Sequence, residues 1–100
     1  NKMYQSITMP EFEQLWKKTP VKLVDVREAD EFAYAHVEGA ISMPLSGLED
    51  TADQLDKDEN YYVMCLSGAR SMAACRYLAS KGYKVTNVMG GISAWRGEIV

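Results

Sequence analysis

The chain has 100 residues, of which 47% are hydrophobic and 25% are charged, and its formal net charge at pH 7 is −3. These values are typical of a single globular domain, expected over residues 1–100, that builds its core without disulfides or a bound metal. They give no support to nucleic-acid binding, because no helix gathers basic residues. No apolar run approaches the length of a membrane span either.

The number of cysteines indicates the cellular compartment in which the protein is expected. Cys65 and Cys75 are the two cysteines, which is too few for a disulfide framework, and the first residues show no signal-peptide pattern. A cytoplasmic, reducing location is therefore expected. Whether the chain is a full gene product or a domain excised from a longer one is left open.

The densest run of charge is acidic and covers residues 48–60 (LEDTADQLDKDEN). A metal site needs convergent ligands, whereas Leu48 and Leu55 indicate that one side of this segment lies against the core while its carboxylates face solvent. We therefore expect no metal site here, and no cofactor.

Strand and helix patterns alternate along the chain, and two apolar, β-branched segments have the composition of buried strands. In chain order we expect a strand over 3–7, a helix over 8–18, a buried strand over 21–26, a short helix over 27–36, a strand over 40–43, a partly helical segment over 45–55, a buried strand over 60–65, a helix over 71–83, a strand from 84 that the glycine pair at 90–91 ends, and a short helix over 92–97.

Helix signals support two of these boundaries. Thr8 and Glu11 have the spacing of a capping box, and Pro10 falls in the first turn, where proline is tolerated. Trp16 shares the apolar stripe of that helix and is expected in the core. Gly82 is expected to end the long helix that follows the second buried strand.

Alternating strands and helices predict a parallel sheet covered on both faces. Functional sites of such sheets gather at the carboxyl ends of the strands. Three chemically distinctive segments end strands here, namely DVRE (25–28), CLSGARS (65–71) and MGG (89–91). Their agreement places a candidate site at this edge.

Cys65 begins a loop that runs from a buried strand into a helix. Gly68 permits backbone conformations closed to other residues, so successive N–H groups can turn inward as an anion nest in front of the helix N-terminus. Such a nest stabilises a thiolate. Arg70 adds a positive charge at the rim, and Ser71 is expected to cap the helix. The alternative is that Cys65 is a small buried core residue and Arg70 an ordinary surface residue.

Four other polar or reactive residues have structural alternatives. Asp25 and Arg27 end a buried strand, and an ion pair between them is as good an interpretation as contact with substrate or with the cysteine loop. Cys75 lies on the core stripe of its helix, so a buried core role is favoured over a resolving thiol. His36, the single histidine, is expected to make a structural hydrogen bond.

Three segments in this order resemble the signatures of single-domain rhodaneses, a family of sulfurtransferases. They are VDVREADEFAYAHVEGAISMPL (24–45), YYVMCLSGARSMAACRYLASKGY (61–83) and NVMGGISAW (87–95). The departures are mild: Ala35 replaces a usual glycine and Val37 a usual isoleucine. The resemblance implies an α/β fold with a central, mostly parallel sheet of about five strands and helices on both faces.

The resemblance also implies the chemistry. Cys65 would accept a sulfane sulfur from a donor such as thiosulfate and pass it, as a persulfide, to cyanide or a thiol. The implied partners are this small donor and the acceptor, and a sulfur-relay protein is a further candidate. The cradle would consist of Leu66, Ser67, Gly68, Ala69, Arg70 and Ser71, with Asp25 and Arg27 in support.

Two other functions compete with this interpretation. Phosphatases and arsenate reductases of related fold have one more residue between cysteine and arginine, and the shorter ring from Cys65 to Arg70 suits one sulfur atom better than a tetrahedral oxyanion. A non-enzymatic persulfide carrier or regulatory module is the other alternative, and the presence of Cys65 favours activity. Because Arg70 is the one cation of the loop, thiosulfate as the preferred donor is left open.

Overall fold

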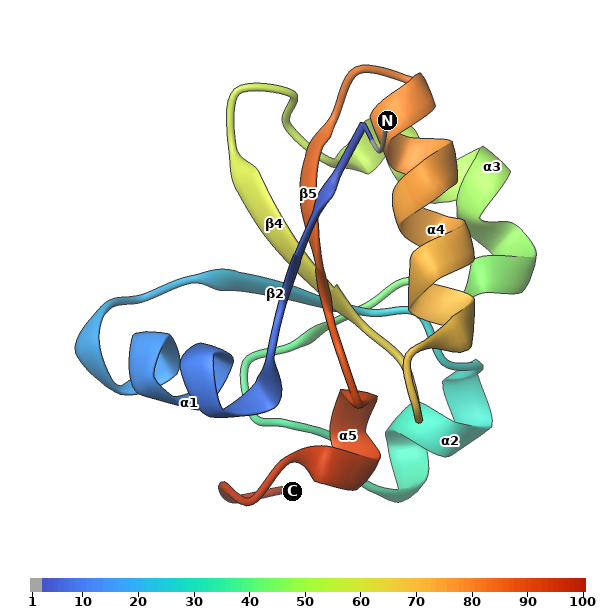
Figure 1. Cartoon of the computed structure of the whole chain (residues 1–100). Helices are drawn as coiled ribbons and strands as arrows, with labels where there is room; N and C mark the ends of the chain where they lie inside the picture. The colour runs from blue at the N-terminus through green and yellow to red at the C-terminus, as the bar shows by residue number, and fades with distance from the viewer. Residues whose placement is uncertain (1–2) are drawn as a thin grey trace.

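Within residues 3–100, which the computed structural model describes, five strands form one sheet (Figure 1). The strand order is β1-β5-β4-β2-β3, and every neighbouring pair is parallel. The expected parallel sheet is confirmed, with β4 at its centre. The strands are β1 (Gln5–Ile7), β2 (Lys22–Asp25), β3 (Ile41–Ser42), β4 (Asn60–Met64) and β5 (Lys84–Val88).

Helices cover both faces of the sheet, as expected. They are α1 (Met9–Lys18), α2 (Ala29–Tyr34), α3 (Leu48–Thr51), α4 (Ala69–Ser80) and α5 (Gly91–Ala94), with single 3₁₀ turns at Leu45–Gly47 and Ala52–Gln54. Apolar residues of α3 and α4 join one core cluster, and those of α1 and α5 join a second. Figure 1 shows α3 and α4 on one side of the strands and α1 on the other.

The start of α1 confirms the capping box. The Thr8 hydroxyl accepts a hydrogen bond from the Glu11 N–H at 3.3 Å, and the Glu11 carboxylate accepts one from the Thr8 N–H at 3.3 Å. Phe12 is fully buried, which contributes about 1.5–3 kcal/mol to folding. Trp16 is half-buried against the same cluster, with its ring 5.8 Å from that of Trp95.

Helix α4 begins earlier than the sequence predicts, at Ala69 rather than Ser71. The reason is Gly68, whose left-handed φ of +115° turns the chain directly into the first helical turn. The end of α4 is as predicted, because Gly82 has a φ of +95° and the N–H of Tyr83 reaches back to the Leu78 carbonyl.

The acidic run behaves as expected from its leucines. Leu48 and Leu55 are buried, whereas most carboxylates between them face solvent. In the described part of the chain, no three His, Cys, Asp or Glu side chains gather where they could hold a metal ion. None of the described helices is long and apolar enough to cross a membrane.

Candidate active site

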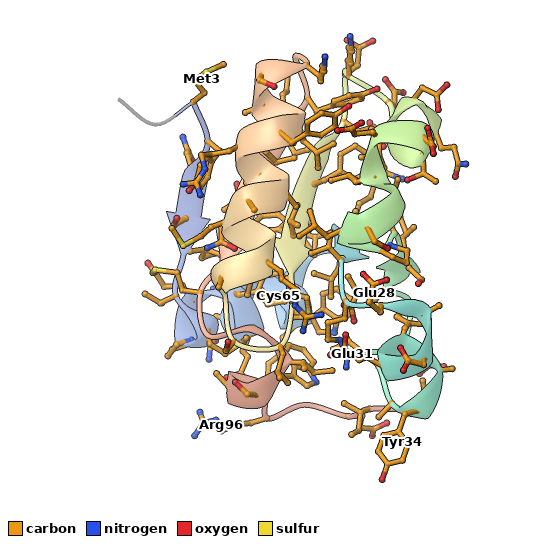
Figure 2. The ribbon with its side chains drawn as sticks, turned by 90° about the vertical axis from the view of Figure 1, so that its right-hand side faces the viewer. Met3, Glu28, Glu31, Tyr34, Cys65 and Arg96 are labelled. Atoms are coloured by element: carbon orange, nitrogen blue, oxygen red, sulfur yellow. The ribbon has the colours of Figure 1, made fainter. Side chains whose placement is uncertain are left out.

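The loop that follows β4 places Cys65 at the carboxyl edge of the sheet. Because β4 is the central strand, this position is enclosed by the loops after β2 and β5, and Cys65 is only 1% exposed. Gly68 is buried with it, whereas Leu66, Ser67 and Ala69 are exposed. Figure 2 shows Cys65 beneath the first turn of α4, with Glu31 on the neighbouring α2 and Glu28 just before the start of that helix.

The MGG segment after β5 fixes the backbone of this loop. The N–H of Ile92 donates to the Cys65 carbonyl at 2.8 Å, and the N–H of Ser93 donates to the Leu66 carbonyl at 2.9 Å. Gly91 makes this approach possible, because a Cβ there would overlap the carbonyl groups of both Cys65 and Leu66. The structure therefore brings two of the three predicted strand-end segments into direct contact.

Replacing Gly91 with alanine is expected to lower the free energy of unfolding by about 2 kcal/mol or more, because the added Cβ meets backbone that cannot easily yield. Its φ of +58° adds strain for any other residue. Urea unfolding measures the loss. Gly47→Ala is the matched control, since a Cβ there meets nothing within 4 Å. Equal losses at the two positions would show that the contact with the loop is not the cause.

The sulfur of Cys65 lies between a backbone N–H group and a hydroxyl group. The Gly68 N–H donates to Sγ at 3.1 Å, and the Cys65 thiol donates to the Ser71 hydroxyl at 3.4 Å. Burial opposes ionisation of the thiol, but hydrogen bonds from the Ser71 hydroxyl and from the N–H groups of Ser71, Gly68 and Ser67 outweigh it, so the pKa of Cys65 lies below its ordinary value. The Gly68 N–H and the Ser71 hydroxyl thus lie at the sulfur, and the wider anion cradle over residues 66–71 stays a prediction.

Ser71 does not cap α4, contrary to the prediction. It lies inside the first turn, fully buried, and its hydroxyl donates to the Gly68 carbonyl at 3.1 Å. Gly68 occupies the capping position instead. When Cys65 is a thiolate, the Ser71 hydroxyl can turn its hydrogen from that carbonyl to Sγ, so the residue serves the sulfur rather than the helix end.

Arg70 is at the rim as predicted, but its charge is not free. Its two terminal nitrogens donate to the two carboxylate oxygens of Glu31 at 2.6 and 3.0 Å. These bonds hold the pKa of Glu31 at about 2 and raise the pKa of Arg70. No local sequence pattern singles out Glu31, and the available signal is its place on the helix that follows DVRE, at the same sheet edge.

Asp25 and Arg27 form an ion pair within the protein. The Arg27 guanidinium donates to Asp25 at 2.8–3.1 Å and to the Ala35 carbonyl at 2.8 Å, and both charged residues are buried. The structure thus realises the ion-pair alternative and ties β2 to the end of α2. No hydrogen bond joins either side chain to Cys65–Ser71 among the described residues, so their support of the cysteine loop stays a prediction.

The family model for the rhodanese-like domain matches residues 8–98. The chain belongs to this family. A sulfurtransferase of Allochromatium vinosum is 40% identical over 76 residues, which cover 75% of this chain and 71% of the relative. The thiosulfate sulfurtransferase GlpE of Coxiella burnetii is 28% identical over 97 residues, covering 96% and 91%. The crystal structure of a rhodanese-related protein from Thermoplasma volcanium superposes with a TM-score of 0.88 at 31% identity, covering 97% and 98%.

Two further residues of this rhodanese-like domain have the structural roles that the sequence predicts. The imidazole Nδ1 of His36 lies 2.7 Å from the Phe32 carbonyl, and its ring stacks on that of Phe32 at 3.8 Å. Cys75 is fully buried, and burial together with the nearby charge of Cys65 raises its pKa to about 12. A thiol with this pKa is a poor nucleophile near neutral pH, so Cys65 is the better candidate.

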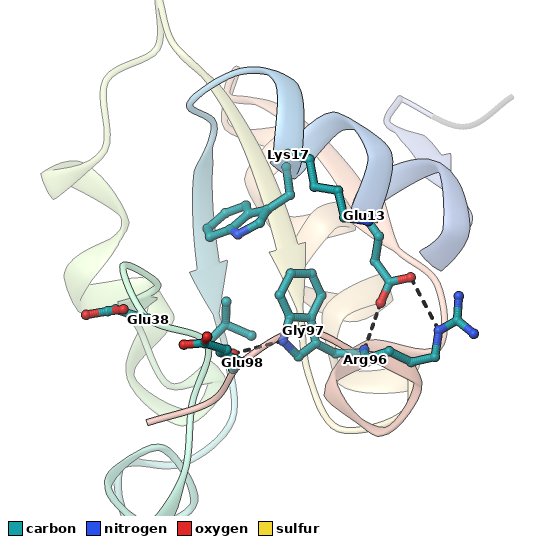
Figure 3. A pocket seen from close by; sticks show the side chains of 9 residues that line it. Glu13, Lys17, Glu38, Arg96, Gly97 and Glu98 are labelled. Carbon is teal, nitrogen blue, oxygen red and sulfur yellow. Dashed lines mark hydrogen bonds and ion pairs between the residues drawn. The ribbon is translucent and has the colours of Figure 1, made fainter.

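A hollow of about 760 Å³ elsewhere in the rhodanese-like domain does not include the cysteine (Figure 3). It lies between α1 and the C-terminal segment, where Glu13 accepts a hydrogen bond from the Arg96 N–H at 2.7 Å. Trp16, Val37 and Trp95 form its apolar lining. None of residues 65–71 lines it.

Proposed function

We propose that the domain transfers sulfane sulfur through a persulfide on Cys65. The observation that carries the proposal is the position of Sγ, which is buried and accepts a hydrogen bond from the Gly68 N–H beside the Ser71 hydroxyl. These donors favour the thiolate, which is the nucleophile in attack on sulfur. The same donors would hold the negative charge of the outer persulfide sulfur once it has formed.

In the first half-reaction, the Cys65 thiolate attacks the outer sulfur of thiosulfate. A bond forms between Sγ and this sulfur, the bond between the two thiosulfate sulfurs breaks, and its electron pair leaves on sulfite. In the second, cyanide or a thiolate attacks the outer persulfide sulfur. The Cys65 thiolate is then released with its electron pair, and thiocyanate or a new persulfide departs.

The position of Arg70 supports sulfur transfer over phosphate chemistry. A phosphatase needs an arginine that is free to bind the equatorial oxygens of a transferring phosphoryl group. Here the guanidinium of Arg70 is turned to Glu31 in a bidentate pair. The short ring from Cys65 to Arg70 also leaves room for a sulfur atom more readily than for a tetrahedral oxyanion.

Parallel turnover assays test the proposal. We expect thiocyanate to form from thiosulfate and cyanide, and no hydrolysis of an aryl phosphate. The reverse pattern would favour a phosphatase. A persulfide that forms on Cys65 but leaves to neither cyanide nor small thiols would favour the carrier alternative.

A further inference from the structure

The ion pair between Glu31 and Arg70 bears on which sulfur donors the site binds, and not only on sulfur transfer itself. Two parallel N–H···O bonds of 2.6 and 3.0 Å join the side chains across α2 and α4, and each side chain is about one-third exposed. Bidentate, charge-assisted pairs of this kind are among the strongest side-chain hydrogen bonds. The guanidinium is therefore occupied before any donor arrives.

Arg70 is the one cation within the loop sequence Cys65–Ser71, so its guanidinium is the formal positive charge that this loop contributes beside the sulfur. Its raised pKa, which the hydrogen bonds with Glu31 chiefly cause, also responds to the negative charge of Cys65. Arg70 directly precedes Ser71, whose hydroxyl lies 3.4 Å from Sγ, so Arg70 belongs to the helical turn that holds the sulfur and its charge acts on an anion that approaches Sγ. The carboxylate of Glu31 offsets that influence.

Glu31 is held in position by its own helix. Its carboxylate accepts a hydrogen bond from the Glu28 N–H at 2.9 Å at the start of α2, and the Arg27 guanidinium reaches its backbone carbonyl at 3.5 Å. Figure 2 shows Glu31 on the side of α2 that faces the Cys65 loop, with Glu28 just before the start of this helix. Three hydrogen bonds, from the Glu28 N–H and from two nitrogens of Arg70, therefore hold the Glu31 carboxylate in place between α2 and α4.

We propose that Glu31 sets the donor selectivity of this site, because by occupying Arg70 it disfavours dianionic donors such as thiosulfate relative to sulfane donors of lower charge, such as organic thiosulfonates. This inference rests on the proposed function. Glu31 acts through Arg70 and is a positioning residue. Its effect falls on donor binding, and hence on KM, more than on the sulfur-transfer step.

The two donor classes undergo the same bond changes, which isolates charge as the variable. With a thiosulfonate, the Cys65 thiolate attacks the outer sulfur, a bond to Sγ forms, and the sulfur–sulfur bond of the donor breaks. The electron pair leaves on a sulfinate. Thiosulfate carries two negative charges into this step, whereas benzenethiosulfonate carries one.

The test compares Glu31→Gln with the parent, using thiosulfate and benzenethiosulfonate as donors and cyanide as acceptor. Glutamine keeps an oxygen that can accept from the Glu28 N–H but removes the charge. We expect KM for thiosulfate to fall about tenfold and KM for benzenethiosulfonate about threefold, because a dianion gains twice the Coulomb energy of a monoanion. We expect kcat to change little for either donor.

Asp30→Asn is the matched control, because it removes an exposed carboxylate from the same helical turn and should leave both KM values unchanged. In the double variant Glu31→Gln, Arg70→Gln, the gain in thiosulfate binding should disappear. Equal changes in KM for the two donors, or the same effect from Asp30→Asn, would overturn the inference.

A separate readout distinguishes this inference from the proposed function. If neither donor adds sulfur to Cys65 in any variant, the proposed function fails. If the persulfide forms in all of them and KM does not depend on Glu31, only the selectivity inference fails. Should Glu31→Gln not fold, the dependence of KM for thiosulfate on salt concentration in the parent protein decides. A shallow dependence of KM for thiosulfate agrees with a neutralised Arg70, and a steep one contradicts it.

Discussion

Replacing Cys65 with serine is expected to lower turnover of thiosulfate and cyanide by about three orders of magnitude or more, because it removes the nucleophile that carries the covalent intermediate. The hydroxyl can accept the Gly68 N–H in place of Sγ, so the loop should keep its shape. Thiocyanate formation under saturating donor measures the loss. Circular dichroism and urea unfolding should show a fold close to that of the parent.

The contrast with Cys75 sharpens this prediction. Cys75 lies in the core with a pKa of about 12, so blocking or replacing it should not remove the persulfide chemistry. If Cys65→Ser retained substantial turnover while its fold was intact, the sulfur would have to travel by another residue. The proposed mechanism would then be wrong.

Replacing Asp25 with asparagine is expected to lower the free energy of unfolding by about 3–5 kcal/mol, because it leaves the buried Arg27 guanidinium without a counter-charge. The two side chains are 0% and 6% exposed, and they are joined at 2.8 Å. Asparagine has nearly the same shape and still offers an oxygen to Arg27, so loss of charge is the main change. Urea unfolding measures the effect.

The pair between Lys22 and Glu59 is the matched control for this experiment. Its nitrogen–oxygen distance is 3.6 Å and both side chains are about half exposed, so Glu59→Gln should cost under about 1 kcal/mol. Similar losses from both variants would contradict the importance of burial. If the Asp25→Asn variant is folded and stable but inactive, the result would instead support direct contact of this pair with substrate.

Much of the fold could be predicted because hydrophobic periodicity and the residues at turns and helix ends determine it. The buried strands β2 and β4, the capping box at Thr8 and the stop at Gly82 all rest on local patterns that tertiary packing reinforces. The predicted start of α4 was wrong because capping statistics favour serine, whereas a glycine in a left-handed conformation can also act as the capping residue.

The chemistry of the site was less predictable than its location. The strand-end rule places Cys65 and the MGG segment at one edge, and the close approach of Gly91 to the carbonyl groups of Cys65 and Leu66 confirms that contact. The pair between Arg70 and Glu31 joins residues 39 positions apart. No local spacing encodes such a contact, because it depends on how α2 and α4 come together in the folded sheet.

The measurement that tests the central claim most directly is mass analysis of the protein after incubation with thiosulfate, first intact and then as peptides. We expect a gain of one sulfur atom, located on the peptide that contains Cys65, and its complete removal by cyanide with release of thiocyanate. No gain in mass, or a sulfur atom found on Cys75 instead, would contradict the account.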